Sequence, residues 1–230
     1  KANIIDSATC AISKQEPLPE KPFPLPQLAP HLLTRVSKEG HKGKNVPTTL
    51  DGTLQHQVNR IIEHHHKTLS QNEIHNACAI VLDVETGNVL AYTGNTTTIN
   101  SEHGNDVDVI TAARSTGSIL KPLLYSSILS DGEILPNALV PDIPTQIGSY
   151  SPKNYFLTYD GAVPARKAIA RSLNVPIVRM LQQYSVEKLH FKLKKIGMTT
   201  ITQPANHYGL SLILGGAEGK LWDITGIYAS

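Results

Sequence analysis

The chain has 230 residues, of which 40% are hydrophobic and 17% are charged, and these proportions are ordinary for a globular protein. At roughly 150 residues per domain, this length predicts one large domain, with or without an appendage. The 21 basic and 19 acidic side chains leave a net charge of +2, which argues against a nucleic-acid-binding protein and against a polyacidic tail.

Hydropathy and cysteine content say little about location. The longest apolar run, Ala77 to Leu82, is far shorter than the ~18 to 20 residues that cross a bilayer. The start of the chain carries Asp6 and does not read as a signal peptide, so we expect neither a membrane span nor a signal peptide. Cys10 and Cys78 allow at most one disulfide, and Cys78 lies in a run typical of a buried strand.

Prolines dominate the segment from Pro17 to Pro30. Proline has no backbone N–H and favours extended polyproline geometry, so we interpret this segment as a stiff connector. The alternative is a ligand for a proline-recognising module, but leucines and a phenylalanine alternate with the prolines as if packed on something. We assign residues 1–47 to a linker, and a linker near an N-terminus implies that another domain precedes it.

The next element is an amphipathic helix from about Thr53 to Ser70, preceded by Asp51 as a plausible N-cap. Its apolar residues recur at helical spacing on one stripe: Leu54, Val58, Ile61, Ile62 and Leu69. The consecutive histidines His64 to His66 suggest a metal site, but neighbouring helical residues point about 100° apart and cannot converge on one ion. We interpret them as solvated helix surface and expect no metal.

The sequence then predicts a β-hairpin, because two β-rich runs, Ala77–Asp83 and Asn88–Gly94, are separated by a turn that contains Gly87. Residues 95–108 lack periodicity and are expected to form an exposed, candidate functional loop. Beyond Val109 the pattern is mostly helical, with helices expected at Leu120–Ser130, Pro164–Asn174, Pro176–Tyr184, Val186–Ile196 and Tyr208–Ala217. A hairpin leading into several helices predicts a mixed α and β fold with an incomplete sheet.

Ser118 and Lys121 are three residues apart at an expected helix N-terminus, which places both side chains on one face of the first turn. A serine hydroxyl becomes a good nucleophile when a base takes its proton, and a lysine amine is such a base if burial lowers its pKa toward neutrality. The helix N-terminus also offers free N–H groups to an oxyanion. Ser-x-x-Lys often occurs by chance in ordinary capped helices, so this pair needs corroboration.

Ser172 and Asn174 provide that corroboration, because they flank a leucine just before Pro176. A second hydroxyl can relay protons, and a carboxamide can both accept from and donate to a peptide backbone. Taken alone, Asn174 reads as a helix C-cap; with the first pair, the catalytic interpretation is favoured. We expect Ser118 to begin a helix and Ser172 to lie within hydrogen-bonding distance of Ser118 or Lys121.

These two pairs resemble the first two of the three motifs of penicillin-recognising serine transferases, the third being a Lys-Thr-Gly strand. The surrounding segments are similar to the transpeptidase domain of the class A penicillin-binding proteins, in particular of their 1C type. Those segments are Gly117–Pro122, Tyr150–Asn154, Gly161–Arg166, Ser172–Pro176 and Tyr208–Gly216. The connector at Leu18–Pro26 is similar to the joint between the glycosyltransferase and the transpeptidase of that family.

The resemblance implies an α+β fold of the penicillin-binding-protein and serine β-lactamase type, with residues 48–230 forming the N-terminal part of the transpeptidase domain. It implies that Ser118 attacks the penultimate D-alanine of a peptidoglycan stem peptide, releases the terminal D-alanine and passes the acyl group to an amine. Lys121 would be the general base, Ser172 the proton relay and Asn174 the partner of the substrate amide. β-Lactams would acylate the same serine.

The same resemblance implies no cofactor, no metal and no nucleic-acid partner. It places the protein in the periplasm, or on the extracytoplasmic face of the bacterial inner membrane, and leaves membrane anchoring to a segment upstream of Lys1. It also implies a bifunctional parent that carries a glycosyltransferase.

The sequence departs from the family pattern in one respect, since no Lys-Thr-Gly occurs in the 230 residues. We therefore expect a truncated, catalytically silent chain whose cleft is open to water, so that Lys121 keeps a near-normal, protonated amine. The alternatives are a D-Ala-D-Ala carboxypeptidase or β-lactamase of the same superfamily, a β-lactam-binding sensor, or a non-catalytic scaffold that binds partners through residues 95–108.

Overall fold

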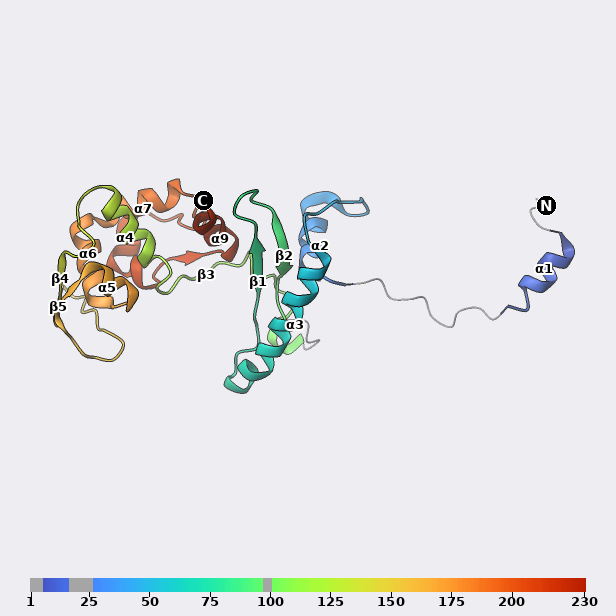
Figure 1. Ribbon diagram of the computed structural model, residues 1–230, viewed down its shortest axis with the longest axis horizontal. Helices are drawn as coiled ribbons and strands as arrows, with labels where there is room; N and C mark the ends of the chain where they lie inside the picture. Colours follow the sequence, from blue (N-terminus) through green and yellow to red (C-terminus); the bar gives the residue numbers. More distant parts are fainter. Residues whose placement is uncertain (1–5, 17–26, 97–100) are drawn as a thin grey trace.

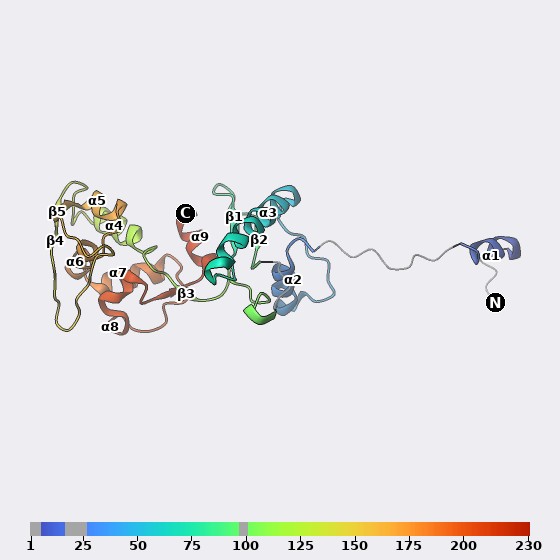
Figure 2. The same ribbon diagram turned by 90° about the horizontal axis from the view of Figure 1, so that it is seen from below.

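The computed structural model describes residues 6–16, 27–96 and 101–230. Within these residues the strands form two-stranded antiparallel sheets, and helices pack around them. Figures 1 and 2 show two groups of elements next to each other, a hairpin with two helices and a larger, mostly helical group. The predicted α+β fold with an incomplete sheet is therefore confirmed. In the described part of the chain, the helices are all too short or too polar to cross a bilayer.

The α-helices before the hairpin begin where an aspartate or a proline favours the start of a helix. They are α1 (Ser7–Ser13), α2 (Pro30–Val36), which continues into a π-helical turn (Ser37–His41), and α3 (Gly52–Leu69), which ends in a short 3-10 turn (Ser70–Asn72). Asp51 caps α3 as predicted, because its carboxylate accepts the backbone N–H of Leu54 at 2.8 Å. The boundaries of α3 differ by one residue at each end from the helix predicted over 53–70.

The predicted hairpin consists of β1 (Ala79–Leu82) and β2 (Val89–Thr93), paired antiparallel with Ala79 opposite Thr93. Gly87 takes a left-handed conformation in the turn, with φ of 72°. Helix α3 is held on the hairpin by Gln55, whose buried amide accepts from the Tyr92 N–H at 2.7 Å and donates to the Tyr92 carbonyl at 3.2 Å. Cys78 was expected to be buried in this strand, but it precedes β1 and is a partly exposed, free thiol.

Part of the segment assigned to a linker packs on the hairpin. His31 in α2 touches the hairpin so closely that a Cβ on Gly94 would lie 2.4 Å from the His31 Cβ. Its Nε2 lies 2.7 Å from the carbonyl oxygen of Asn105. Arg35 lies over the ring of Trp222, 4.3 Å from the centroid. The division at residue 47 stays a prediction, and the proline-rich residues 17–26 lie outside the described part.

The loop expected over 95–108 is less exposed than its composition predicts. Asn95 and Thr96 are buried, and the Asn95 amide donates to Asn76 at 2.8 Å and to the carbonyl of Val107 at 3.1 Å. Satisfying these buried amides inside the protein fixes the start and the end of the loop. A short 3-10 turn covers Ser101–His103, and residues 97–100 lie outside the description.

The second group is built around α6 (Asn174–Tyr184), whose apolar face is completely buried. The elements around it are α4 (Lys121–Ser130), the strand pair β4 (Leu139–Asp142) and β5 (Gly161–Pro164), α5 (Ala165–Ala170) and α7 (Val186–Lys195). The helix predicted over 164–174 ends at Ala170, because Ser172 has a left-handed backbone with φ of 52° and cannot continue a right-handed helix.

The last elements differ most from the prediction. The expected helix over 208–217 is replaced by α8 (Ala205–Tyr208) and a 3-10 helix (Gly209–Leu214), because Gly209 and Gly215 have positive φ of 51° and 96°. Strand β6 (Glu218–Gly219) then pairs with β3 (Arg114–Ser115), and α9 (Leu221–Ala229) returns to the hairpin and packs on β1. Helix α9 thus connects the two groups (Figure 1).

Candidate active site

Ser118 lies in a tight turn before α4 rather than at the start of the helix. Backbone bonds of the i to i+3 type hold this turn, from Ile119 N to Thr116 O and from Lys121 N to Ser118 O, both at 3.1 Å. Such bonds are tighter than those of an α-helix, so regular helix begins at Lys121, three residues after Ser118, and the expectation that Ser118 begins the helix is wrong. The Ser118 side chain is exposed.

The turn is supported from behind by a segment about 100 residues later in the chain. The Ser115 hydroxyl donates to the carbonyl of Gly215 at 2.9 Å. The backbone N–H and the hydroxyl of Thr116 both donate to the carbonyl of Ala217, at 3.2 and 3.0 Å. Gly215 must be glycine for this contact, because a Cβ there would lie 2.6 Å from the Ser115 Oγ. The position of Ser118 therefore depends on the β3–β6 pair.

Lys121 is buried, with 1% of its surface exposed, and its ammonium points into the group built around α6. It donates to the carbonyl of Ser172 at 2.9 Å, to the hydroxyl of Ser172 at 3.1 Å and to the Asn174 Oδ1 at 2.7 Å. Burial lowers the pKa of Lys121 from 10.5 to about 8. The expectation of a near-normal amine is therefore wrong, because Lys121 is buried. A cleft open to water stays a prediction.

Of the three groups that accept from Lys121, the Ser172 hydroxyl alone can reverse its role. The carbonyl of Ser172 and the Asn174 Oδ1 are acceptors under all conditions, whereas a hydroxyl both donates and accepts. A neutral Lys121 amine has two N–H groups and one lone pair. It can keep both obligate acceptors satisfied and accept a hydrogen bond from Ser172. The geometry therefore lets Lys121 lose a proton without leaving either obligate acceptor unpaired.

The turn between α5 and α6 presents Ser172 and Asn174 to Lys121. Its left-handed Ser172 directs the carbonyl and the hydroxyl of one residue to the same ammonium. Asn174 is the first residue of α6 and not the C-cap of α5, which was its alternative interpretation. Pro176 is compatible with this start, because the first turn of a helix does not use its backbone N–H groups.

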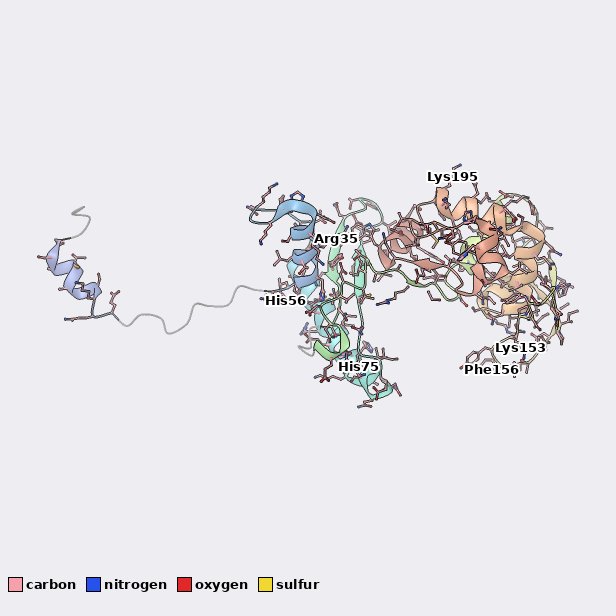
Figure 3. All side chains as sticks on the ribbon, turned by 180° about the vertical axis from the view of Figure 1, so that it is seen from behind. Arg35, His56, His75, Lys153, Phe156 and Lys195 are labelled. Atoms are coloured by element: carbon pink, nitrogen blue, oxygen red, sulfur yellow. The ribbon has the colours of Figure 1, made fainter. Side chains whose placement is uncertain are left out.

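The Asn174 amide is held at both ends. Its Oδ1 accepts from Lys121, and its Nδ2 donates to the carbonyl of Lys153 at 2.8 Å. The next residue, Asn154, is buried and accepts the first backbone N–H groups of α6. The Lys153-Asn154 segment is part of the family resemblance seen in the sequence, but the sequence pattern indicated no role for either residue. Figure 3 shows Lys153 near the exposed Phe156, far from Arg35 and His56.

The structure brings three of the four candidate residues into direct contact. Lys121, Ser172 and Asn174 form one hydrogen-bonded cluster, although 51 and 53 positions separate the lysine from the other two. Ser118 is one turn before Lys121, but its hydroxyl has no hydrogen-bond partner among the described residues. An exposed and unpaired hydroxyl is available to an incoming carbonyl.

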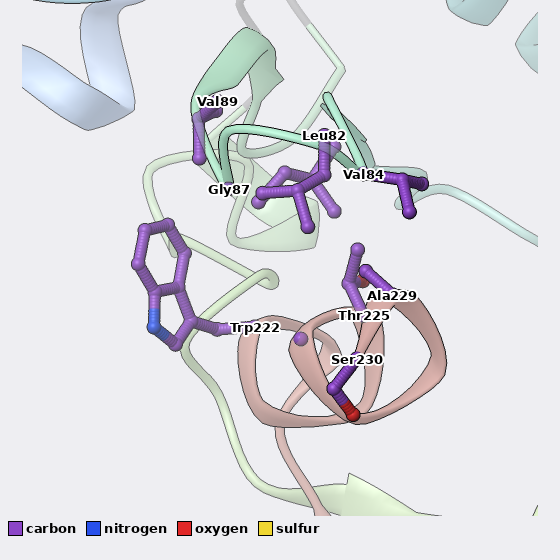
Figure 4. Close-up of a pocket in the computed structure, with 10 residues that line it drawn as sticks. Leu82, Val84, Gly87, Val89, Trp222, Thr225, Ala229 and Ser230 are labelled. Carbon is purple, nitrogen blue, oxygen red and sulfur yellow. The ribbon is translucent and has the colours of Figure 1, made fainter.

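A separate pocket of about 350 Å³ lies between the hairpin and α9 and does not involve this cluster. Figure 4 shows its walls, with Trp222 on one side and Leu82, Val84 and Val89 on the other. The lining is mostly apolar, and the side chains of the cluster take no part in it. Ser118 and Lys121 therefore lie outside this pocket.

Sequence comparison matches residues 77–215 to the family described as the penicillin binding protein transpeptidase domain. The chain belongs to this family. The matched range contains Ser118, Lys121, Ser172 and Asn174 and ends at Gly215, which supports the turn that carries Ser118. The resemblance stated from the sequence is thereby confirmed at the level of the transpeptidase family.

Individual penicillin-binding proteins extend the match. The chain is 32% identical over 218 residues to penicillin-binding protein 1C of Escherichia coli, covering 95% of this chain and 28% of that protein. It is 29% identical over 177 residues to penicillin-binding protein 1F of Bacillus subtilis, covering 76% of this chain and 24% of that protein. The chain thus spans about a quarter of the length of these relatives.

Solved structures agree on the penicillin-binding protein fold. The structure of PonA1 from Mycobacterium tuberculosis superposes with a TM-score of 0.63, 19% identity and coverage of 88% of this chain and 54% of that chain. Penicillin-binding protein 1A from Haemophilus influenzae gives a TM-score of 0.56, 22% identity and coverage of 67% and 23%. At these identities the likeness concerns the fold.

Proposed function

We propose that this chain is part of a peptidoglycan cross-linking enzyme, a D-Ala-D-Ala transpeptidase that works through an acyl-enzyme on Ser118. The observation that carries the proposal is the buried Lys121 ammonium, held by Ser172 and Asn174 one turn after an exposed serine. Burial gives the lysine a pKa of about 8, close to the pH at which a general base is most effective.

Acylation begins when the Ser118 Oγ attacks the carbonyl carbon of the penultimate D-alanine. As the new C–O bond forms, the hydroxyl proton passes to the neutral amine of Lys121, directly or through the hydroxyl of Ser172. The tetrahedral intermediate then collapses with cleavage of the C–N bond, and the leaving amine of the terminal D-alanine takes the proton from Lys121. The products are a serine ester and free D-alanine.

In the second step the acyl group is transferred from Ser118 to an acceptor amine. An amine of a neighbouring stem peptide loses a proton to Lys121 and attacks the ester carbonyl. The C–O bond to Ser118 breaks, and the proton returns to the serine oxygen. The enzyme is regenerated and a new peptide bond links the two stems. Asn174 supports both steps, because its Oδ1 accepts from Lys121 and orients the amine.

β-Lactams enter the same scheme as acyl donors. Opening of the four-membered ring forms the ester with Ser118, and the ring nitrogen takes the proton from Lys121 in place of the leaving D-alanine. Because the nitrogen stays attached to the acyl group, it does not diffuse away, and the ester persists. Penicillin binding is therefore the direct readout of the Ser118 nucleophile.

The alternative within the same chemistry is a D-Ala-D-Ala carboxypeptidase, in which water takes the place of the acceptor amine. The exposed position of Ser118 is compatible with either acceptor. Incubation with a D-Ala-D-Ala peptide and a competing amine separates the two, because aminolysis gives a new amide and hydrolysis gives the shortened acid.

We propose further that the whole protein resembles its class A relatives in carrying a glycosyltransferase and in acting at the periplasmic face of the inner membrane. The match over 95% of this chain to the E. coli 1C protein supports that assignment. Peptidoglycan stem peptides would then be its substrates and β-lactams its covalent inhibitors.

Fluorescent penicillin labelling of the whole protein, followed by mass spectrometry of the tryptic peptide that contains Ser118, tests the proposal. We expect a mass increase equal to one intact penicillin on that serine. Absence of labelling, or labelling at another residue, would contradict it. A sensor without turnover would be labelled by penicillin, and a scaffold would not be labelled. Neither would release D-alanine from a peptide substrate.

A further inference from the structure

Asn154 joins three parts of the second group through one buried amide that is 3% exposed. Its Oδ1 accepts the backbone N–H groups of Asn174 and Val175, at 3.0 and 3.1 Å. Its Nδ2 donates to the Asp142 Oδ1 at 2.7 Å and to the carbonyl of Thr158 at 2.9 Å. All the hydrogen-bonding positions of the amide that face the protein are therefore used.

The two bonds from α6 replace the usual N-cap. A helix leaves its first N–H groups without partners, and the residue just before the helix normally satisfies them. Here that residue is Leu173, which has no side chain able to accept. Asn154, which lies 20 positions before Asn174, supplies the acceptor instead. The start of α6, and with it Asn174, is fixed by a residue outside the helix.

Asp142 in turn fixes the orientation of Asn154. Its carboxylate is 1% exposed; one oxygen accepts from Asn154 and the other accepts the backbone N–H of Asp160 at 3.0 Å. A buried carboxylate can only accept, so the Asn154 Nδ2 must face it and the Oδ1 must face α6. The neighbouring carbonyl of Lys153 accepts from the Asn174 Nδ2, which leaves the Asn174 Oδ1 for Lys121.

We infer that Asn154 is a positioning residue for acylation, which acts through Asn174 on Lys121 and is itself oriented by Asp142. This inference rests on the proposed function, because it assigns a role in the chemistry at Ser118. Asn154 does not touch Lys121 or the nucleophile. It determines where α6 begins and therefore where the Asn174 amide lies.

Replacing Asn154 by Ala removes the acceptor at the start of α6 and releases Asn174. A displacement of about 1 Å in a catalytic group costs about 10²-fold in rate, so we expect a fall of that order in the acylation rate constant. Loss of the Asn174 acceptor also weakens the protonated form of Lys121. The midpoint of the pH–rate profile should consequently move to lower pH, which a general loss of folded protein would not cause.

Exchanging the two polar side chains provides a rescue. Asn154→Asp alone places two carboxylates opposite each other where 2.7 Å now separates donor and acceptor, and it should acylate more slowly than Asn154→Ala. Adding Asp142→Asn restores a donor toward residue 154 and an acceptor toward Asp160. We expect the double variant to recover at least about tenfold over Asn154→Asp, although Thr158 loses its donor.

The experiment measures penicillin acylation of the whole protein from pH 6 to 10 for wild type, Asn154→Ala, Asn154→Asp and the exchanged pair. Asn206→Ala, at an exposed position of α8, is the matched control and should equal wild type. Thermal unfolding establishes that each variant is folded. A wild type that is not acylated at Ser118 would overturn the proposed function and this inference with it. An acylated wild type with unchanged rates and profiles in the Asn154 variants would overturn the inference alone.

Discussion

The Lys121 Nζ and the Ser172 Oγ lie 3.1 Å apart, although 51 residues separate them in the chain. The contact joins the first residue of α4 to a left-handed turn between α5 and α6. It places a hydroxyl that can either accept or donate beside an amine that can be protonated or neutral. Lys121 is buried, whereas Ser172 and Ser118, which lies one turn earlier, are exposed.

Ser118→Ala should abolish covalent penicillin binding, because it removes the atom that forms the ester. Gel fluorescence and intact-protein mass spectrometry measure the labelling. Ser126→Ala, at an exposed position of the following helix α4, is the control and should label like wild type. Equal labelling of wild type and Ser118→Ala would exclude Ser118 as the nucleophile.

The acylation rate should rise with pH through the pKa of Lys121, which is about 8. The neutral amine is the base, and its fraction increases from about 1% at pH 6 to about half at pH 8, so the rate should increase about fifty-fold over this interval. Lys121→Arg should lose this dependence and most of the rate, because a guanidinium stays protonated. Stopped-flow acylation at graded pH measures both; a flat wild-type profile would contradict the assignment of Lys121 as base.

Substitutions of Ser172 should affect stability and the acylation rate differently. Its φ of 52° is costly for a residue with a Cβ and not for glycine, so Ser172→Gly should be more stable than Ser172→Ala by about 1 kcal/mol. Both variants lack the relay hydroxyl and should acylate equally slowly. Urea unfolding gives the stabilities and penicillin acylation the rates. If Ser172→Gly acylated as fast as wild type, the backbone conformation at residue 172 would matter for the rate and the hydroxyl would not.

Gly94→Ala should detach α2 from the hairpin, because its Cβ would lie 2.4 Å from the Cβ of His31. We expect a loss of about 1 to 3 kcal/mol in unfolding free energy, and faster proteolysis between residues 28 and 47. Gly52→Ala, which meets open space, is the control. Protection that is unchanged in Gly94→Ala would contradict the packing described.

The fold of the first half could be predicted because its signals are local. Asp51 caps α3, and the alternating β-rich runs pair as a hairpin, since both depend on residues a few positions apart. The segment at 208–217 could not be predicted in the same way. Its apolar content resembles a helix, but the backbone at Gly215 is set by contact with Ser115, which no local pattern reports.

The candidate site shows the same division. The spacing of Ser118 and Lys121, and of Ser172 and Asn174, could be read directly, but the burial of Lys121 could not, because it depends on α6 and the turn before it. The role of Asn154 could not be predicted from the sequence for a related reason. An asparagine between a lysine and a tyrosine has no helical or strand pattern, and its role becomes visible when α6 is found to lack a cap of its own.

The pairing of β3 with β6 has a consequence for the timing of assembly on the ribosome. The Ser115 hydroxyl finds its acceptor at Gly215, 100 positions later. At about 5 to 20 residues per second, a nascent chain waits roughly 5 to 20 seconds after Ser115 is made before that acceptor exists. The turn that carries Ser118 is thus completed among the last parts of these 230 residues, and a chain released early would carry an unsupported Ser118.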